Sequence, residues 1–245
     1  IENLRPGAVS LETYSMLDDV EAIGQMILDG HIVAIRGLGG VHLTCDATRA
    51  ATVAELRHRK GRKSKAFALM ARDLDVVHKF CEVSDIEAAT LSGPEAPIVL
   101  LKARPNTLPE GIAPGLDRLG VMLPYTPFYH LILHRMDRPV VMTSGNPSGQ
   151  PQCTGNQETR ERLGTIADFA CLHDRDIANR IDDSVVRVDL GRVRVLRRAR
   201  GYAPSSLSLP PGFEHRHQIL AMGGELKNTF CLIKDDQAIL SQHIG

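Results

Sequence analysis

Short apolar runs alternate with helix-like segments along most of this chain. Each apolar run is four or five residues long, which suits a buried strand better than a helix. These runs lie at residues 32–35, 66–70, 98–101, 120–123 and 139–142. The helix-like segments lie at residues 15–29, 48–57, 126–136 and 156–163. This alternation predicts an α/β domain with a mixed, partly parallel sheet.

The length of the chain limits how many domains it can form. With 245 residues, of which 43% are hydrophobic, it can bury one large core, or one large domain and part of a second. We expect an N-terminal extension at residues 1–14, the α/β domain at 15–209, and a linker with the opening of a second domain at 210–245. The chain starts at Ile1 and stops just after an apolar run, which suggests a piece of a longer polypeptide. No apolar run approaches the roughly 20 residues that cross a bilayer, so we expect a cytoplasmic protein with no membrane partner.

One basic run stands out against an otherwise balanced chain. Residues 56–70, LRHRKGRKSKAFALM, hold six Lys or Arg side chains within nine residues and no acid, although the whole chain carries 29 basic and 29 acidic residues. Gly61 interrupts the helix-like pattern, which predicts that Lys60, Arg62 and Lys65 occupy a turn between a helix and a buried strand. Arginine forks and lysine point charges together suit a nucleotide triphosphate. A solvated charged loop is the alternative.

Two glycine-rich turns follow apolar strands. Residues 36–40 contain three glycines, which permit close approach of the backbone to a ligand but match no nucleotide-binding motif. Residues 143–149 follow the strand at 139–142, and ligands favour the carboxyl ends of strands in open α/β sheets. Ser144 and Asn146 in this turn are suited to bind phosphate or ribose. The spacing alone does not separate this reading from a turn that caps the next helix.

A second basic cluster consists of Arg192, Arg194, Arg197, Arg198 and Arg200. Arg192 and Arg194 alternate with Val193 and Val195. Because successive side chains of a strand point to opposite faces, we expect a strand that buries its valines and displays its guanidinium groups.

Two features raise the question of a metal. Asp182 and Asp183 adjoin a strand and invite a magnesium site, although a turn with surface ion pairs explains at least one of them. His130 and His134 lie four residues apart on a predicted helix, but no Glu or Cys partner accompanies them, which favours packing or solvent exposure. The sequence therefore leaves the metal unassigned.

Six motifs in one order resemble a known family. They are IRGLGGVHLTCDA, LRHRKGRKSKAFALM, GVMLPYTP, VMTSGNPSG, RIDDSVVRV and LRRARGYAP. Over about residues 30–210 this set is similar to the YrdC-like domain of HypF, the carbamoyltransferase of nickel–iron hydrogenase maturation. The resemblance implies a twisted mixed sheet with flanking helices and a concave basic cavity. Residues 221–245 resemble the opening strands of the following HypF domain, an ASKHA-type fold related to threonylcarbamoyltransferases.

The resemblance also implies a reaction. A carbamate oxygen, from carbamate derived from carbamoyl phosphate, attacks the α-phosphate of ATP and gives carbamoyl-adenylate and pyrophosphate. The full-length protein then passes the carbamoyl group to the C-terminal cysteine of HypE, on the path to the cyanide ligands of the hydrogenase. Such nucleotidyl transfer needs clustered cations, and Mg²⁺ carried by the nucleotide, rather than a protein nucleophile.

The matching motifs imply roles for individual residues. The K-x-R pattern falls on Lys60 and Arg62, which are expected to be catalytic and to bind the ATP phosphates. The other expected ATP-binding residues are Lys65, Ser144, Asn146, Ser184, Arg197 and Arg200. The glycine loop provides the expected carbamate site, at Arg36, Gly39 and Gly40.

Two other functions remain open. A threonylcarbamoyl-AMP synthase for tRNA modification shares the fold and the basic turn, but the threonine-binding hydroxyls expected near residues 36–40 are missing. A double-stranded RNA-binding module would also use a basic concave face. The overall neutrality of the chain counts against a nucleic-acid partner.

Overall fold

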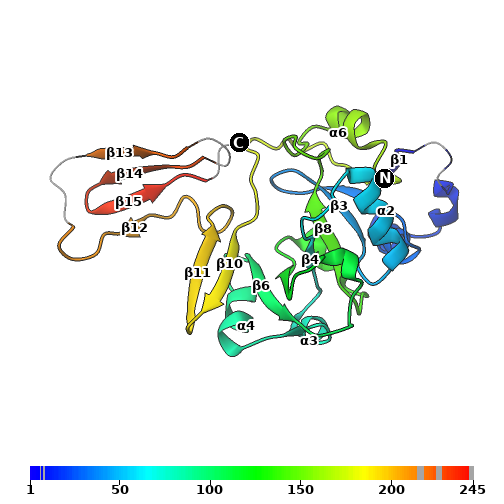
Figure 1. Ribbon diagram of the computed structural model, residues 1–245. Helices are drawn as coiled ribbons and strands as arrows, with labels where there is room; N and C mark the ends of the chain where they lie inside the picture. The colour runs from blue at the N-terminus through cyan, green and yellow to red at the C-terminus, as the bar shows by residue number, and fades with distance from the viewer. Residues whose placement is uncertain (6, 8, 214–217, 225–227, 243–245) are drawn as a thin grey trace.

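The computed structural model describes residues 1–5, 7, 9–213, 218–224 and 228–242. Most of the chain forms one large sheet with helices on both sides, and a second, smaller sheet follows beside it (Figure 1). Within the described ranges, no helix is both long and apolar enough to cross a bilayer.

The main sheet contains eleven strands among the described residues. In spatial order they are β1 (Glu2–Asn3), β9 (Phe169–Cys171), β2 (Val33–Arg36), β3 (Val41–Asp46), β8 (Val140–Ser144), β4 (Ala68–Met70), β7 (Arg118–Met122), β6 (Ile98–Ala103), β10 (Val185–Asp189) and β11 (Arg192–Arg197), with β5 (Cys81–Glu82) paired to β6. The pairs β2–β9, β4–β7 and β6–β10 are parallel and the others are antiparallel. The predicted α/β class with a mixed, partly parallel sheet is therefore confirmed.

Helices cover both faces of this sheet, which explains the continuous apolar runs. Helices α1 (Asp19–Leu28) and α5 (Pro127–Leu133) contribute to one apolar layer, which includes Val33 and Ile35 of β2. Helices α2 (Ala50–Lys60) and α3 (Leu74–His78) contribute to the other, which includes Ile32 and Ala34. A strand buried on both faces requires apolar side chains at successive positions. The remaining helices are α4 (Asp85–Leu91), α6 (Asn156–Leu163) and two short 3-10 turns, Leu11–Tyr14 and Glu110–Ile112.

Several helix boundaries differ from the predicted ones, among them the start of α1 and the end of α2. Helix α1 begins at Asp19 rather than at residue 15, because the Asp18 carboxylate caps it by accepting a bond from the Glu21 N–H at 2.8 Å. Helix α2 extends to Lys60, where Gly61 ends it in a left-handed conformation with φ of 65°. The expectation that Lys60 lies in the turn is therefore wrong: Lys60 is the last residue of the helix, and the turn starts after it.

The valine face of β11 is also not as predicted. Val193 is 40% exposed and Val195 is 41% exposed, so neither is buried. Strand β11 is the last strand of the main sheet and pairs with β10 alone among the described residues, so little of the chain covers it (Figure 1).

The C-terminal part forms a sheet of its own. Strands β12 (Leu207–Ser208), β15 (Gln237–Leu240), β14 (Phe230–Lys234) and β13 (Ile219–Met222) pair in this order, all antiparallel. The boundary expected at residue 210 thus falls after the first strand of this sheet. The expected second-domain fragment includes residues 214–217, 225–227 and 243–245, which lie outside the described residues. At the other end, β1 lies within the segment expected to be an N-terminal extension, yet it pairs with β9 of the main sheet.

Candidate active site

The end of helix α2 meets the turn after β8. The Lys60 ammonium donates hydrogen bonds to the Ser144 carbonyl at 2.5 Å, the Asn146 carbonyl at 2.7 Å and the Asn146 side-chain oxygen at 3.2 Å. Lys60 is only 3% exposed, so its charge is held inside the protein. Two segments that the sequence analysis assigned to one site are therefore in direct contact.

The surroundings of Lys60 change its acidity. Burial, followed by the nearby charge of Arg62, lowers the pKa of Lys60 from 10.5 to about 7. An ammonium has three N–H donors, whereas a neutral amine has two. Loss of the proton therefore leaves one of the three accepting oxygens without a donor.

The turn after β8 is rigidly built. The Ser144 hydroxyl donates to the Asn146 side-chain oxygen at 2.6 Å, and the Asn146 amide donates to the Gln150 carbonyl at 2.6 Å. Gly145 lies against β3, where an added Cβ would come within 2.7 Å of the Val41 carbonyl oxygen. Only glycine fits at this position, and the turn presents Ser144 and Asn146 in a fixed arrangement.

The segment after Gly61 folds back on itself. Arg62 donates to the backbone carbonyls of Lys65 at 3.1 Å and Ala66 at 2.6 Å, and its guanidinium carbon lies 5.3 Å from the centre of the Phe67 ring. The Lys65 side chain is exposed and forms none of the hydrogen bonds or ion pairs found in the described part of the chain. We call residues 61–66, which follow Lys60 at the end of α2, the cation turn.

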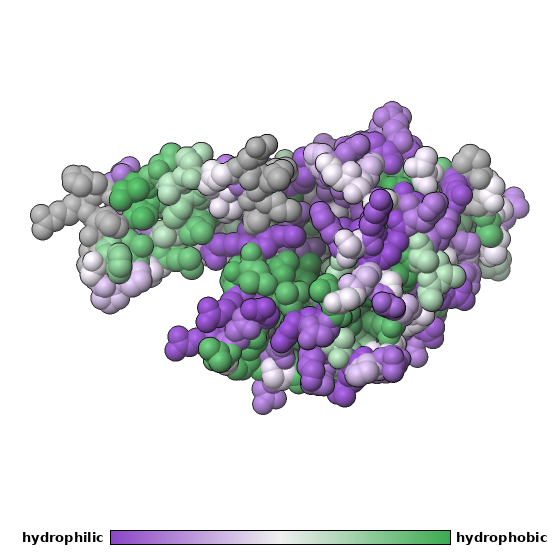
Figure 2. All heavy atoms as spheres, viewed as in Figure 1, coloured by the Kyte–Doolittle hydropathy of each residue, from purple (hydrophilic) through white to green (hydrophobic). Residues whose placement is uncertain are grey.

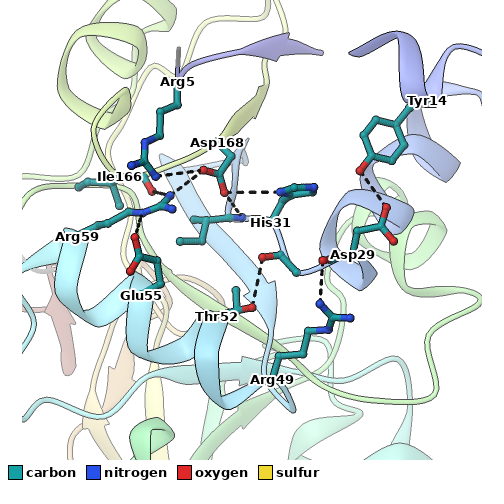
Figure 3. A network of polar contacts seen from close by, with 12 residues as sticks. Arg5, Tyr14, Asp29, His31, Arg49, Thr52, Glu55, Arg59, Ile166 and Asp168 are labelled. Atoms are coloured by element: carbon teal, nitrogen blue, oxygen red, sulfur yellow. Dashed lines mark hydrogen bonds and ion pairs between the residues drawn. The ribbon is translucent and has the colours of Figure 1, made fainter. Parts of the chain in front are cut away.

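A network of hydrogen bonds around Arg59 holds helix α2 against the sheet. Arg59 donates to the Glu55 carboxylate at 2.7 Å, the Asp168 carboxylate at 2.8 Å and the Ile166 carbonyl at 3.0 Å (Figure 3). Asp168 also accepts a bond from the Ile32 N–H at 2.9 Å, just before β2. Because Arg59 precedes Lys60, these bonds hold the last turn of α2 in position.

Arg36 at the end of β2 is a buried cation. It is 5% exposed, and its guanidinium donates to the Asn156 side-chain oxygen at 2.8 Å and the His173 carbonyl at 2.5 Å. Its Nε has no partner, and no carboxylate in the described ranges lies within ion-pair distance. An isolated buried charge is costly, so this position favours an anionic ligand.

Gly39 and Gly40, in the loop after Arg36, are packed against other parts of the protein. An added Cβ on Gly39 would come within 2.5 Å of the Ile181 carbonyl, and one on Gly40 would collide with the Gln152 side chain. These glycines therefore allow close packing of protein segments. The glycine pattern in the sequence predicted close approach of a ligand instead.

A buried polar cluster lies beside this loop. The Asp183 carboxylate accepts a hydrogen bond from Arg200 at 2.8 Å and lies 3.8 Å from the His42 ring, whose other nitrogen lies 2.9 Å from the Tyr129 hydroxyl. Burial alone would raise the pKa of Asp183, but the contacts with His42 and Arg200 lower it from 3.8 to about 2. The Arg200 guanidinium also stacks on the Tyr125 ring at 3.5 Å. The Asp183 carboxylate that invited a magnesium site is thus used in an internal ion pair.

The residues expected from the last two motifs lie where β10 begins and β11 ends. We call these two strands and the residues at their ends the wall. Ser184 is fully buried, and its hydroxyl donates to the Arg200 carbonyl at 2.9 Å and accepts from the Ala199 N–H at 2.8 Å. Arg197 is half-buried at the end of β11. Figure 2 shows that the surface is hollowed near the centre of the view, between this wall and the body that carries β4 and β8.

Comparison with known proteins identifies the family. The profile of the Sua5/YciO/YrdC family, described as telomere recombination, matches residues 25–199. The chain belongs to this family. The profile of the HypF Kae1-like domain matches residues 214–245, so a Sua5/YciO/YrdC domain is followed here by sequence of a second type. The resemblance to HypF found in the sequence is confirmed.

Individual relatives agree with this assignment. The carbamoyltransferase HypF of Rhodobacter capsulatus is 56% identical over 216 residues, covering 88% of this chain and 29% of the relative. A crystal structure of full-length HypF in a phosphate- and nucleotide-bound form superposes with a TM-score of 0.87 at 48% identity, covering 94% of this chain and 30% of that one. The threonylcarbamoyl-AMP synthase of Vibrio vulnificus is 23% identical over 158 residues, covering 61% of this chain and 83% of the relative. The chain thus spans less than a third of the length of the HypF proteins that it matches.

Several residues around the candidate site were assigned no role from the sequence. They are His42, Arg57, Arg59, Tyr125 and Tyr129. Tyr125 belongs to the motif GVMLPYTP, which marked it for attention but gave it no role. No spacing rule predicts that His42 contacts Tyr129, because the two lie 87 residues apart.

Proposed function

We propose that this chain is the nucleotide-activating part of a HypF-type carbamoyltransferase. In this proposal it converts ATP and carbamate to carbamoyl-adenylate and pyrophosphate. A carbamate oxygen forms a bond to the α-phosphorus while the bond from that phosphorus to the bridging oxygen of the β-phosphate breaks. Pyrophosphate leaves with the electron pair. The similarity to proteins named carbamoyltransferase HypF, and to a HypF structure described as nucleotide-bound, supports this choice.

One observation carries the proposal: the cations of the site have no acidic partner. Lys60, Arg62 and Lys65 form no ion pair with any carboxylate of the described residues; Lys60 contacts the turn after β8, and Arg62 and Lys65 follow it in the cation turn. Such a group is suited to neutralise a polyphosphate and to stabilise charge that develops on leaving pyrophosphate. Lys60 and Arg62 are the proposed catalytic residues, and Lys65 is free to reach the outer phosphates.

The other residues take supporting roles in this proposal. Ser144 and Asn146 contact the α-phosphate or the ribose from their fixed turn. Arg36 binds the carboxylate of carbamate, which completes its missing ion pair, while Gly39 and Gly40 shape the loop. Ser184 is fully buried, and Asp183 balances the charge of Arg200, so we assign these two residues to building the wall and leave Arg197 as the distal phosphate contact.

Magnesium is proposed to arrive with the nucleotide. Among the described residues, no three His, Cys, Asp or Glu side chains gather as a metal site, and Asp183 is paired with Arg200. Phosphate oxygens are ordinary Mg²⁺ ligands, and the ion there neutralises charge on the triphosphate. The role of the whole protein in transferring the carbamoyl group to HypE in the cytoplasm, and in hydrogenase maturation, belongs to the same proposal.

A pyrophosphate-exchange assay tests the reaction. We expect the chain to exchange labelled pyrophosphate into ATP when ammonium carbamate is added. Lys60→Ala should abolish the exchange, whereas Lys102→Ala, which removes a surface lysine paired with Glu82, should leave it unchanged. Failure of the wild-type chain to bind ATP at all would overturn the proposal.

The family also includes threonylcarbamoyl-AMP synthases, so threonine needs its own test. Residues 36–40 offer the guanidinium of Arg36 and backbone groups, but no hydroxyl to pair with threonine. A site without hydrogen-bond partners for a substrate gains little from that substrate. We expect no threonylcarbamoyl-adenylate by mass spectrometry when L-threonine and bicarbonate are added, and we expect Arg36→Ala to slow carbamate-dependent exchange. A threonine-containing adenylate would favour the synthase instead.

A further inference from the structure

The Arg57 side chain bonds the backbone of the cation turn from the helix that precedes it. It belongs to α2, one helical turn before Gly61. Its guanidinium donates to the backbone carbonyls of Arg62 at 2.9 Å, Lys65 at 3.1 Å and Lys63 at 3.4 Å, all within the turn. It also donates to the carbonyls of Ile112, at 3.2 Å, and Gly111.

These contacts use every hydrogen-bond donor of the Arg57 side chain. A guanidinium has five N–H donors, and five backbone carbonyls accept from Arg57. The accepting segments come from both sides, namely the cation turn and the 3-10 turn Glu110–Ile112. A lysine carries the same charge but has three donors on one nitrogen, so it cannot hold both segments in this way.

A shared aromatic ring connects Arg57 to a proposed phosphate ligand. The Arg57 guanidinium carbon lies 4.5 Å from the centre of the Phe67 ring, and that of Arg62 lies 5.3 Å from the same centre. Phe67 is 1% exposed, so the ring is a fixed surface for both groups. The position of Arg62 therefore depends on the loop that Arg57 folds and on the ring that both contact.

Neither guanidinium has an acidic partner among the described residues. Carbonyl oxygens satisfy the hydrogen-bond donors of Arg57, yet they do not cancel its charge. The charge of Arg57 consequently adds to the field around Arg62, and it contributes, after burial, to lowering the pKa of Arg62. A bound polyanion is the group that balances both charges.

We infer that Arg57 is a positioning residue for polyphosphate binding: it folds the cation turn into the shape that presents Arg62 to the phosphates. This inference rests on the proposed function, because it assumes that the cation turn binds ATP. It goes beyond that function by assigning a role to a side chain that makes no direct contact with the ligand.

The test compares Arg57→Lys with an arginine-to-lysine substitution in another part of the fold. We expect Arg57→Lys to raise the Kd for ATP about tenfold, as measured by calorimetric titration of the 245-residue chain. The matched control is Arg104→Lys, because Arg104 also donates to backbone carbonyls, those of His78 and Cys81, but lies in another part of the fold. Thermal unfolding of both variants reports any general loss of stability, and the control should leave ATP affinity unchanged.

A double-mutant cycle separates positioning from ordinary structural support. If Arg57 acts through Arg62, then Arg62→Lys has a smaller effect on the ATP Kd in the Arg57→Lys background than in the wild type. Phe67→Leu removes the shared ring while keeping a buried apolar side chain, and it should weaken ATP binding in the same direction even if Arg57→Lys fails to fold. Wild-type ATP affinity in folded Arg57→Lys, or strictly additive effects of the two lysine substitutions, would overturn the inference. A wild-type chain that does not bind ATP would instead overturn the proposed function, and this inference with it.

Discussion

Lys60 links ATP binding to pH, because its charge changes near neutrality. With a pKa of about 7 in the free protein, about half of the Lys60 side chains are neutral at pH 7 and about nine-tenths at pH 8. Phosphates beside the amine favour its charged form and raise its pKa. Binding of MgATP at pH 8 should therefore take up close to one proton per site.

The same reasoning gives the size of the effect on affinity. If only the charged form of Lys60 binds, the free protein must be protonated first, at a cost that grows with pH. For a pKa of about 7, the Kd for ATP should rise about 50-fold between pH 7 and pH 9, which corresponds to about 2.3 kcal/mol.

Calorimetric titration in buffers of different ionisation enthalpy measures this proton uptake directly. Lys60→Arg is the matched control, because an arginine stays charged throughout this pH range. The variant should take up no proton at pH 8, and its affinity should not fall between pH 7 and pH 9. Equal proton uptake in the variant and the wild type, or none in the wild type, would refute the role of Lys60.

Three further predictions follow from the same structure. Lys60→Ala and Arg62→Ala should each weaken ATP binding by about 1.5–3 kcal/mol without unfolding the chain, and unchanged affinity in both would reduce the cation turn to a solvated loop. Because its folded pKa is depressed, Asp183 should contribute about 2 kcal/mol of stability that is present above pH 4 and lost as the pH falls through about 2. Urea unfolding of Asp183→Asn should show that loss at pH 7 and little further loss in acid, whereas wild-type stability at pH 7 would contradict the ion pair. Amide exchange should be faster in the described residues of the C-terminal sheet, where Leu220 is 60% exposed and Met222 65%, than in residues 30–205, and strong protection there would indicate docking on another surface.

The sequence predicted the elements that local patterns control. Apolar runs predicted β2, β6 and β8, because a strand buried on both faces carries apolar side chains at successive positions. The family resemblance assigned the basic run and the turn at Ser144 and Asn146 to one site, and the structure joins them through Lys60.

Other features depend on contacts that no local pattern encodes. The alternation of valine and arginine in β11 predicted the strand but not its exposure, because exposure depends on whether another segment covers that edge. Arg57 looked like one more cation in a basic run, yet its five carbonyl partners set it apart from Lys63 and Lys65. Asp183 drew attention as a possible metal ligand, and only the fold shows that Arg200 pairs with it and that His42 lies beside it.

The contact between Lys60 and the turn after β8 has a consequence for the protein during its synthesis. The accepting carbonyl of Ser144 lies 84 residues downstream of Lys60. At a ribosomal rate of about 5–20 residues per second, that interval lasts about 4–17 seconds, during which the amine on the nascent chain has no such acceptor and stays in water. The site therefore cannot exist on any early fragment of the growing polypeptide. It is created when a late strand reaches a helix that was made long before.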